Sequence, residues 1–250
     1  MERAALPGRL RWQTGTLVSI TVETSRVKTI ALAMPDWAGH RAGQHVDVRL
    51  TAPDGYQTER SYSIASAPED AYLALTVERL EDGEVSPYLV DELRPGDELE
   101  LRGPVGGYFV WENEPGGAPL FLIGGGSGMT PFRSMVRHHR ASGSRVPVRV
   151  LCSARSLELL IYREELFKLA ADDLIDVSVT LTREAPDDWR GYRGRIDPAL
   201  LATTGWPAGE EPLTYICGPT AFVEVVAAGM VSLGHDPGRI RSERFGGTGG

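Results

Sequence analysis

The 250-residue chain has only two cysteines, Cys152 and Cys217. Two thiols exclude a disulfide framework and an iron–sulfur cluster held by four cysteines of this chain. No apolar run reaches the ~20 residues that a membrane helix needs, and the first residues lack a signal-peptide pattern. The sequence therefore predicts a cytoplasmic protein without membrane insertion. The five histidines show no metal-ligand spacing, so no metal is expected.

Positive charge is scarce in the first half of the chain. Residues 1–115 contain 11 Lys/Arg against 19 Asp/Glu, whereas residues 116–250 contain 15 of each, so the net charge of −8 lies in the first half. Binding to a nucleic-acid backbone needs the opposite balance, and no nucleic-acid partner is expected. The second half is better suited to an anionic ligand.

The first half consists of short, often alternating runs of strand-forming residues separated by turn signals. The predicted strands are residues 14–22, 29–34, 44–50, 58–64, 73–79 and 98–102, with one short helix over 86–93. Six strands at this spacing favour a closed antiparallel β-barrel, and a β-sandwich is the alternative.

Strands and helices alternate in the second half, which predicts a parallel sheet with helices on its faces. The predicted strands are 120–123, 146–151, 176–181 and 214–217, and the helices are 131–141, 157–170 and 221–233. We therefore expect a barrel domain over residues 10–115, an α/β nucleotide-binding domain over 116–245 and a flexible tail over 246–250.

Residues 60–66 read Arg-Ser-Tyr-Ser-Ile-Ala-Ser. In an extended strand Arg60 and Tyr62 lie on one face, where they offer a guanidinium fork for a phosphate and a flat ring for stacking. Ser61 and Ser63 are small enough to let a ligand lie close. A diphosphate joined to a planar heterocycle, such as FAD, fits this set. The alternative is an ordinary strand with a surface arginine.

A glycine-rich turn between an apolar strand and a helix marks a second nucleotide site. Residues 124–131 read Gly-Gly-Gly-Ser-Gly-Met-Thr-Pro, with Thr130 as the expected N-cap and Pro131 at the first helical position. The candidate phosphate-binding residues are Gly124, Gly126, Ser127, Gly128 and Thr130.

The end of the next strand is where a dinucleotide fold selects its cofactor. Ser153 and Arg155 stand there without a neighbouring acid, and Arg183, after the following strand, could reach the same pocket. This arrangement favours NADPH over NADH. NADH stays possible, because 24 of the 26 basic residues are arginine and an arginine at a given place is weak evidence.

Together these segments resemble the ferredoxin–NADP(+) reductase superfamily over roughly residues 12–245. The matching motifs are Arg-x-Tyr-Ser at 60–63, Gly-Gly-x-Gly-x-Thr-Pro at 125–131 and Cys-Gly-Pro at 217–219. The resemblance implies the same order of domains as the strand and helix patterns, with the barrel first and the α/β domain second. It places FAD in the barrel and NAD(P)H in the α/β domain. The resemblance is to those members of the superfamily that carry no iron–sulfur domain of their own.

The resemblance also implies roles for further residues. A second FAD segment would consist of Val77, Gly83, Val85 and Ser86, with backbone N–H groups of the turn at the diphosphate beside Arg60. Cys217, Gly218 and Pro219 would line the nicotinamide pocket, and Glu243 and Phe245 would approach the flavin edge. The implied catalytic residues are Ser63 near flavin N5, Cys217 as a positioning thiol, and Glu243. A solvated carboxylate is the alternative for Glu243.

The implied reaction is hydride transfer from NADPH to flavin N5, followed by single-electron transfer to a separate ferredoxin or iron–sulfur oxygenase component. Because ferredoxins and this first domain are both acidic, such a partner would need a local basic patch, for which Arg41 and Arg49 are candidates. The alternatives are an NADH-dependent reductase of a quinone, ferric ion or free flavin, and a non-enzymatic nucleotide-binding electron-transfer or sensor subunit.

Overall fold

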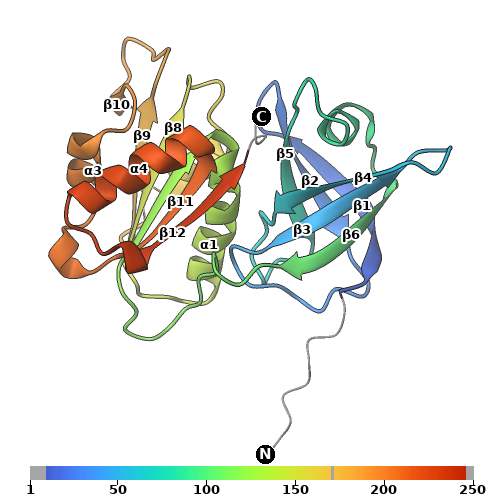
Figure 1. Cartoon of the computed structure of the whole chain (residues 1–250), viewed down its shortest axis with the longest axis horizontal. Coiled ribbons are helices and arrows are strands. Elements are labelled where there is room, and N and C mark those ends of the chain that lie inside the picture. Colours follow the sequence, from blue (N-terminus) through green and yellow to red (C-terminus); the bar gives the residue numbers. More distant parts are fainter. Residues whose placement is uncertain (1–9, 170–171, 246–250) are drawn as a thin grey trace, which may run out of the picture.

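The computed structural model describes residues 10–169 and 172–245, which form two six-stranded sheets side by side (Figure 1). The tail predicted over residues 246–250 lies outside the described residues. No helix among the described residues is long and apolar enough to cross a membrane.

The first sheet is antiparallel and closes into a barrel. Its strands, in the order β4-β3-β6-β1-β2-β5, are β1 (Trp12–Val22), β2 (Val27–Ala33), β3 (His45–Thr51), β4 (Gln57–Ser63), β5 (Leu73–Glu78) and β6 (Glu98–Val105). A bridge between Ile64 and Leu75 joins the two edges of the sheet. The structure therefore has the predicted barrel and not a sandwich. The predicted short helix is present as η1 (Tyr88–Glu92).

The second sheet is parallel, in the order β10-β9-β8-β7-β11-β12. Its strands are β7 (Leu120–Gly125), β8 (Val148–Ala154), β9 (Ile175–Leu181), β10 (Tyr192–Arg193), β11 (Leu213–Pro219) and β12 (Ile240–Phe245). The chain order reverses between β7 and β11. In such sheets a ligand crevice opens at the carboxyl ends of the strands at this point.

Helices cover both faces of this sheet: α1 (Thr130–Ala141), α2 (Arg163–Leu169), α3 (Pro198–Thr204) and α4 (Thr220–Ser232). Leu120 and Leu122 of β7 belong to the core on the α1 side, which also includes Phe109 of the first half of the chain. Phe121 and Ile123 belong to the core under α3 and α4. A central strand buried on both faces explains why this segment reads as an uninterrupted apolar run.

Two predicted elements have clearly different bounds in the structure, and helix α3 is an additional element. The helix predicted over 157–170 begins only at Arg163, because turns fill residues 156–162 and Tyr162 has a φ of 57°, which no right-handed helix allows. The strand predicted over 146–151 runs two to three residues later, as β8. Helix α3 was not predicted, although Asp197 caps it by accepting a hydrogen bond from Leu200 N, a signal present in the sequence.

Candidate functional site

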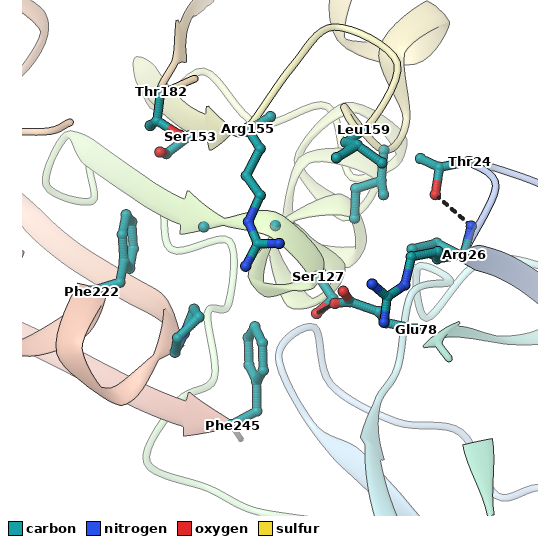
Figure 2. A pocket seen from close by; sticks show the side chains of 16 residues that line it. Thr24, Arg26, Glu78, Ser127, Ser153, Arg155, Leu159, Thr182, Phe222 and Phe245 are labelled. Carbon is teal, nitrogen blue, oxygen red and sulfur yellow. Dashed lines mark hydrogen bonds between the residues drawn. The ribbon is translucent and has the colours of Figure 1, made fainter. Parts of the chain in front are cut away.

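A cavity of about 240 Å³ lies at the carboxyl ends of β7, β8 and β11, where the α/β domain meets the barrel (Figure 2). The structure brings together six of the residues predicted to bind a cofactor, namely Gly126, Ser127, Ser153, Arg155, Pro219 and Phe245. The sequence did not predict the other ten lining residues, which include Thr24, Arg26, Glu78, Thr182 and Phe222. The first three belong to the barrel, so the cavity is built by both domains.

The glycines of the loop serve different purposes. Gly126 has a φ of 57°, and a Cβ added there would meet no atom of the described chain within 4 Å, so its backbone faces open space. A side chain at Gly128 would overlap the carbonyl of Cys217, and one at Gly124 would overlap Met129. Gly126 is thus positioned to approach a ligand, whereas Gly124 and Gly128 permit close packing inside the domain.

Thr130 is not the N-cap that the sequence predicted. The helix α1 begins at Thr130 itself, Met129 occupies the capping position, and Pro131 lies in the first turn. Thr130 is 3 % exposed, and its hydroxyl donates to the carbonyl of Ser127 at 2.7 Å. Its side chain therefore holds the glycine loop in shape and does not line the cavity.

Arg155 directs its guanidinium toward the middle of the cavity, between the loop at Ser127 and the ring of Phe245 (Figure 2). Ser153 and Thr182 lie at the end of the cavity from which the Arg155 side chain extends (Figure 2). Arg183 is exposed and outside the lining, but its backbone N–H donates to the carbonyl of Arg155 at 3.0 Å. The two predicted arginine segments are therefore adjacent, and only Arg155 reaches into the cavity.

Glu78 carries the one carboxylate among the described residues that line the cavity. It ends β5 of the barrel, and its Oε2 accepts a hydrogen bond from Ser127 Oγ at 2.7 Å. Arg26 from the β1–β2 turn lies beside it (Figure 2). Because this contact joins residues 49 positions apart in two domains, no local sequence pattern predicts it.

The first FAD segment has the predicted alternation. In the β3–β4 register Arg60 lies opposite Val48 and Tyr62 opposite Val46, so both are on one face. Within the described residues, the one hydrogen bond of the Arg60 guanidinium goes to the carbonyl of Glu59. Tyr62 packs on the barrel core, and burial raises the pKa of its phenol to about 12, so the ring stays neutral.

Ser61 and Ser63 lie on the opposite face of β4. The Ser61 hydroxyl donates to Asp47 Oδ1 at 2.7 Å, and Ser63 pairs with His45 in the register. The strand keeps regular alternation as far as Ser63. A contact of Ser63 with a ring stacked on Tyr62 therefore depends on its backbone or on the change of direction after β4, where Ile64 N donates to Gln44 O.

The second FAD segment lies next to the first. Glu84, within the turn over 83–86, accepts a hydrogen bond from Thr58 Oγ1 at 3.0 Å, and Thr58 shares the face of Arg60. The side chains of Val77 and Val85 are fully buried in the barrel core, so these two residues can offer a ligand only their backbone. The Ser86 hydroxyl accepts from Leu80 N at 3.0 Å, close to Gly83, and shapes the turn.

Cys217 and Glu243 are neighbours across β11 and β12, where they form a register pair. Burial and the nearby carboxylate raise the pKa of the Cys217 thiol well above its usual value. This excludes a thiolate nucleophile at neutral pH. Burial raises the pKa of Glu243 from 4.5 to about 7, so this side chain is able to hold or release a proton near neutral pH.

The remaining predicted residues, Gly218, Pro219 and Phe245, lie at the carboxyl ends of β11 and β12. Gly218 lies against the ring of Phe222, which also contacts Gly125. Phe245 is a cavity residue, together with Phe222 and Pro219 (Figure 2). Its ring therefore flanks the nucleotide cavity beside Arg155.

Arg41 and Arg49, the candidates for a basic patch, each form an ion pair with a carboxylate. Arg49 forms a two-bond ion pair with Glu100, with the shorter N–O distance 2.7 Å, and stacks on Trp12. Arg41 lies 3.5 Å from Glu112. Each of the two arginines therefore has a carboxylate beside it, which weakens its contribution to a basic patch.

The residues present fit two nucleotide cofactors. Arg60, the ring of Tyr62 and the turn over 83–86 can hold a diphosphate attached to a planar ring. The open backbone at Gly126, at the end of β7 and before α1, can receive a second diphosphate, with the Arg155 guanidinium in the middle of the same cavity (Figure 2). Among the described residues, no cluster of three or more His, Cys, Asp or Glu side chains could hold a metal ion.

Two family models match the chain: the oxidoreductase FAD-binding domain over residues 14–110 and the oxidoreductase NAD-binding domain over residues 122–228. Ferredoxin–NADP reductase B of Sorangium cellulosum is 38% identical over 192 residues, which are 74% of this chain and 76% of that protein. The reductase subunit of glycine betaine monooxygenase from Chromohalobacter salexigens is 32% identical over 237 residues. That match includes 92% of this chain, but the chain spans only 63% of the length of the relative.

Among solved structures, the flavohem-like FAD/NAD-binding domain of nitric oxide dioxygenase from Vibrio cholerae has the same fold, with a TM-score of 0.83. Its sequence is 27% identical, and the match covers 94% of this chain and 99% of that one. The pairing of a barrel with a parallel α/β domain is therefore shared with this solved structure.

Proposed function

The chain belongs to the ferredoxin–NADP(+) reductase superfamily, and from this we propose that it oxidises NADPH with FAD and delivers single electrons to a separate acceptor. The observation that carries the proposal is the cavity shared by the two domains, where the open backbone of Gly126 and the guanidinium of Arg155 face the same space. Bound FAD supplies the redox chemistry, which accepts hydride from NAD(P)H and releases its electrons one at a time.

The proposed roles of the chain's own residues follow from their chemistry. Arg60 and the turn over 83–86 bind the FAD diphosphate, and Tyr62 stacks on the ring system. Cys217 orients the nicotinamide as a neutral thiol. Glu243 exchanges a proton at the edge of the site, which its raised pKa supports. Ser63, at the end of β4, lies near flavin N5 and contacts it through its backbone or through the change of chain direction after this strand.

NADPH is the proposed reductant because the guanidinium of Arg155 and the hydroxyl side chains of Ser153 and Thr182 line the same cavity. That set suits a 2′-phosphate, whereas a 2′-hydroxyl would be bound by an acid at the end of β8. Glu78 does not fill that role, since it enters from the barrel beside Ser127. NADH-dependent turnover is the alternative.

The proposed acceptor is a one-electron protein, either a ferredoxin or an iron–sulfur component of an oxygenase. The names of the relatives support this class, since one is a ferredoxin–NADP reductase and another a monooxygenase reductase subunit. The pairing of Arg41 and Arg49 with carboxylates favours an acceptor less acidic than a typical ferredoxin, or a small acceptor such as a quinone, ferric ion or free flavin.

Two further assignments are proposals. The division between a domain over 10–115 and one over 116–245 falls in the segment between β6, which ends at Val105, and β7, which begins at Leu120. A cytoplasmic location agrees with Cys152 and Cys217, which are buried and not disulfide-bonded.

An anaerobic titration of the purified protein with NADPH, and separately with NADH, tests the function by following the flavin absorbance. We expect the protein to carry or take up FAD and to be bleached by about one equivalent of NADPH. A protein that binds no added FAD would contradict the whole proposal. Faster bleaching by NADH would overturn only the choice of nucleotide.

A further inference from the structure

The outer face of β2 and β5 is the surface of the barrel that meets the α/β domain. In the register of these strands Val27 lies opposite Glu78, and Thr29 lies opposite Thr76. Val27 belongs to the same buried cluster as the core residues under α1 and α2, and Glu78 bonds Ser127 of the glycine loop. Thr29 and Thr76 are buried as well, so the α/β domain covers this face.

Tyr162 is the residue that covers the two threonines. Its hydroxyl donates to Thr76 Oγ1, and Thr76 Oγ1 lies 2.8 Å from Thr29 Oγ1. Thr29 donates to Glu23 Oε1 at 2.7 Å, and the backbone N–H of Tyr162 donates to Glu23 Oε2 at 3.1 Å. These bonds form a closed ring in which one residue of the α/β domain is held at both its backbone and its side chain by three residues of the barrel.

The backbone of Tyr162 is unusual for a bulky residue. Its φ of 57° lies in the left-handed region, which side chains with a Cβ seldom adopt. Such a conformation persists where the surroundings over-determine it, and it concentrates at functional sites. Here the surroundings are the hydrogen-bonded ring, the guanidinium of Arg133 5.0 Å from the ring centroid, and burial that leaves Tyr162 4 % exposed.

The ring is attached directly to both walls of the cavity. On the barrel side, Thr76 lies two residues before Glu78 on the same face of β5. On the α/β side, Ile161 lines the cavity next to Tyr162. The side chain of Thr130, whose hydroxyl shapes the loop through Ser127 O, also lies near the Tyr162 phenol. A displacement of Tyr162 would therefore move the glycine loop relative to the barrel.

We propose that Tyr162 is a positioning residue that sets the separation of the two domains, and so the distance between a nicotinamide in the cavity and a flavin on the barrel. The inference rests on the proposed function. Tyr162 touches neither cofactor and takes no part in proton transfer, since burial raises the pKa of its phenol to about 12. Hydride transfer is sensitive to this distance, because reacting atoms must lie within about 3–3.5 Å of each other.

The test uses the FAD-loaded full chain and the variant Tyr162→Phe, which keeps the ring and removes the hydroxyl. Tyr192→Phe is the matched control, since Tyr192 is a partly exposed tyrosine of the same domain outside the ring. We expect the limiting rate of flavin reduction at saturating NADPH to fall about tenfold in the variant. The long-wavelength absorbance from nicotinamide stacked on flavin should weaken, while FAD content and the Kd for NADPH stay close to wild type.

A readout that needs no turnover is hydrogen–deuterium exchange of the FAD-loaded protein without nucleotide. Peptides from β2 and β5 should exchange faster in Tyr162→Phe than in wild type. In Tyr192→Phe their exchange should equal that of wild type. Thr76→Val removes the same bond from the barrel side. Because Thr76→Val also removes the contact with Thr29 Oγ1, the double variant should be no slower than Thr76→Val alone, since the Tyr162–Thr76 bond is already lost there.

Wild-type reduction rate and wild-type absorbance in Tyr162→Phe would overturn the inference. If Tyr162→Phe loses FAD or fails to fold, the test rests on Thr76→Val. A folded Thr76→Val protein with the wild-type rate of flavin reduction and wild-type hydrogen–deuterium exchange would also overturn the inference. A wild-type protein that neither NADPH nor NADH reduces would instead contradict the proposed function, so the two failures are distinguishable.

Discussion

Ser127 Oγ donates a 2.7 Å hydrogen bond to Glu78 Oε2, across the boundary between the glycine loop and β5 of the barrel. The loop is the proposed site of a diphosphate, so the structure places a carboxylate where a ligand with at least two negative charges is expected. Arg26, beside Glu78, offsets part of this charge (Figure 2). The contact therefore opposes nucleotide binding and ties the loop to the barrel in the absence of a nucleotide.

Glu78→Gln should bind NADPH more tightly than wild type. The amide oxygen still accepts the Ser127 bond, but the charge is removed, and a gain of about 1 kcal/mol corresponds to roughly fivefold in Kd. Equilibrium titration of the FAD-loaded protein measures it. Glu81→Gln, which removes an exposed carboxylate outside the cavity lining, is the control. The advantage should shrink at high salt, and weaker binding by Glu78→Gln would show that the carboxylate helps the ligand.

Arg155→Ala should weaken NADPH binding far more than NADH binding. A charge-assisted contact with the 2′-phosphate is worth about 1.5–3 kcal/mol, which is roughly 10- to 150-fold in Kd, and NADH lacks that group. Arg190→Ala removes an exposed arginine of the same domain and should leave both Kd values unchanged. Arg183→Ala should have a smaller effect than Arg155→Ala, because Arg183 is outside the cavity lining. Equal losses for both nucleotides would remove Arg155 from the phosphate pocket.

Arg60→Ala should lower the affinity for FAD by roughly 10- to 100-fold, because the diphosphate loses a charge-assisted hydrogen-bond donor. Fluorescence titration of apoprotein with FAD measures this. Arg94→Ala is a close match, since each guanidinium donates to the carbonyl of the preceding residue and each is on the barrel. Unchanged FAD affinity in Arg60→Ala would contradict the assignment of the first FAD segment.

Glu243 should make folding stability depend on pH between 4.5 and about 7. In this window the folded protein retains a proton that the unfolded chain releases, so the free energy of unfolding falls as pH rises. Glu243→Gln carries no titrating group, so its stability relative to wild type should increase from pH 4.5 to 7 and then level off. Urea unfolding at pH 4.5, 6 and 8 tests this, with the exposed Glu224→Gln as control. A difference that does not vary with pH would mean that Glu243 ionises normally.

Much of the fold could be read from local patterns. Alternation in β5, with Leu75 and Val77 inward and Thr76 and Glu78 outward, is a period-two signal that needs no tertiary information. The apolar run of β7 followed by glycines and a helix is equally local. Patterns failed where a neighbour distant in sequence decided the conformation, as in residues 156–162, where contacts with the barrel hold Tyr162 at a positive φ.

The candidate site divides in the same way. The sequence alone determined the order of a barrel and an α/β domain, the glycine loop, and the arginine and tyrosine of β4, because each depends on chain geometry within a few residues. Only the tertiary structure decided that Glu78 and Arg26 of the barrel line the nucleotide cavity, that Val85 is buried, and that Arg49 is paired with Glu100. These outcomes depend on which surfaces meet when two separate hydrophobic cores are packed, and pairings between residues far apart in the chain leave no periodic trace in it.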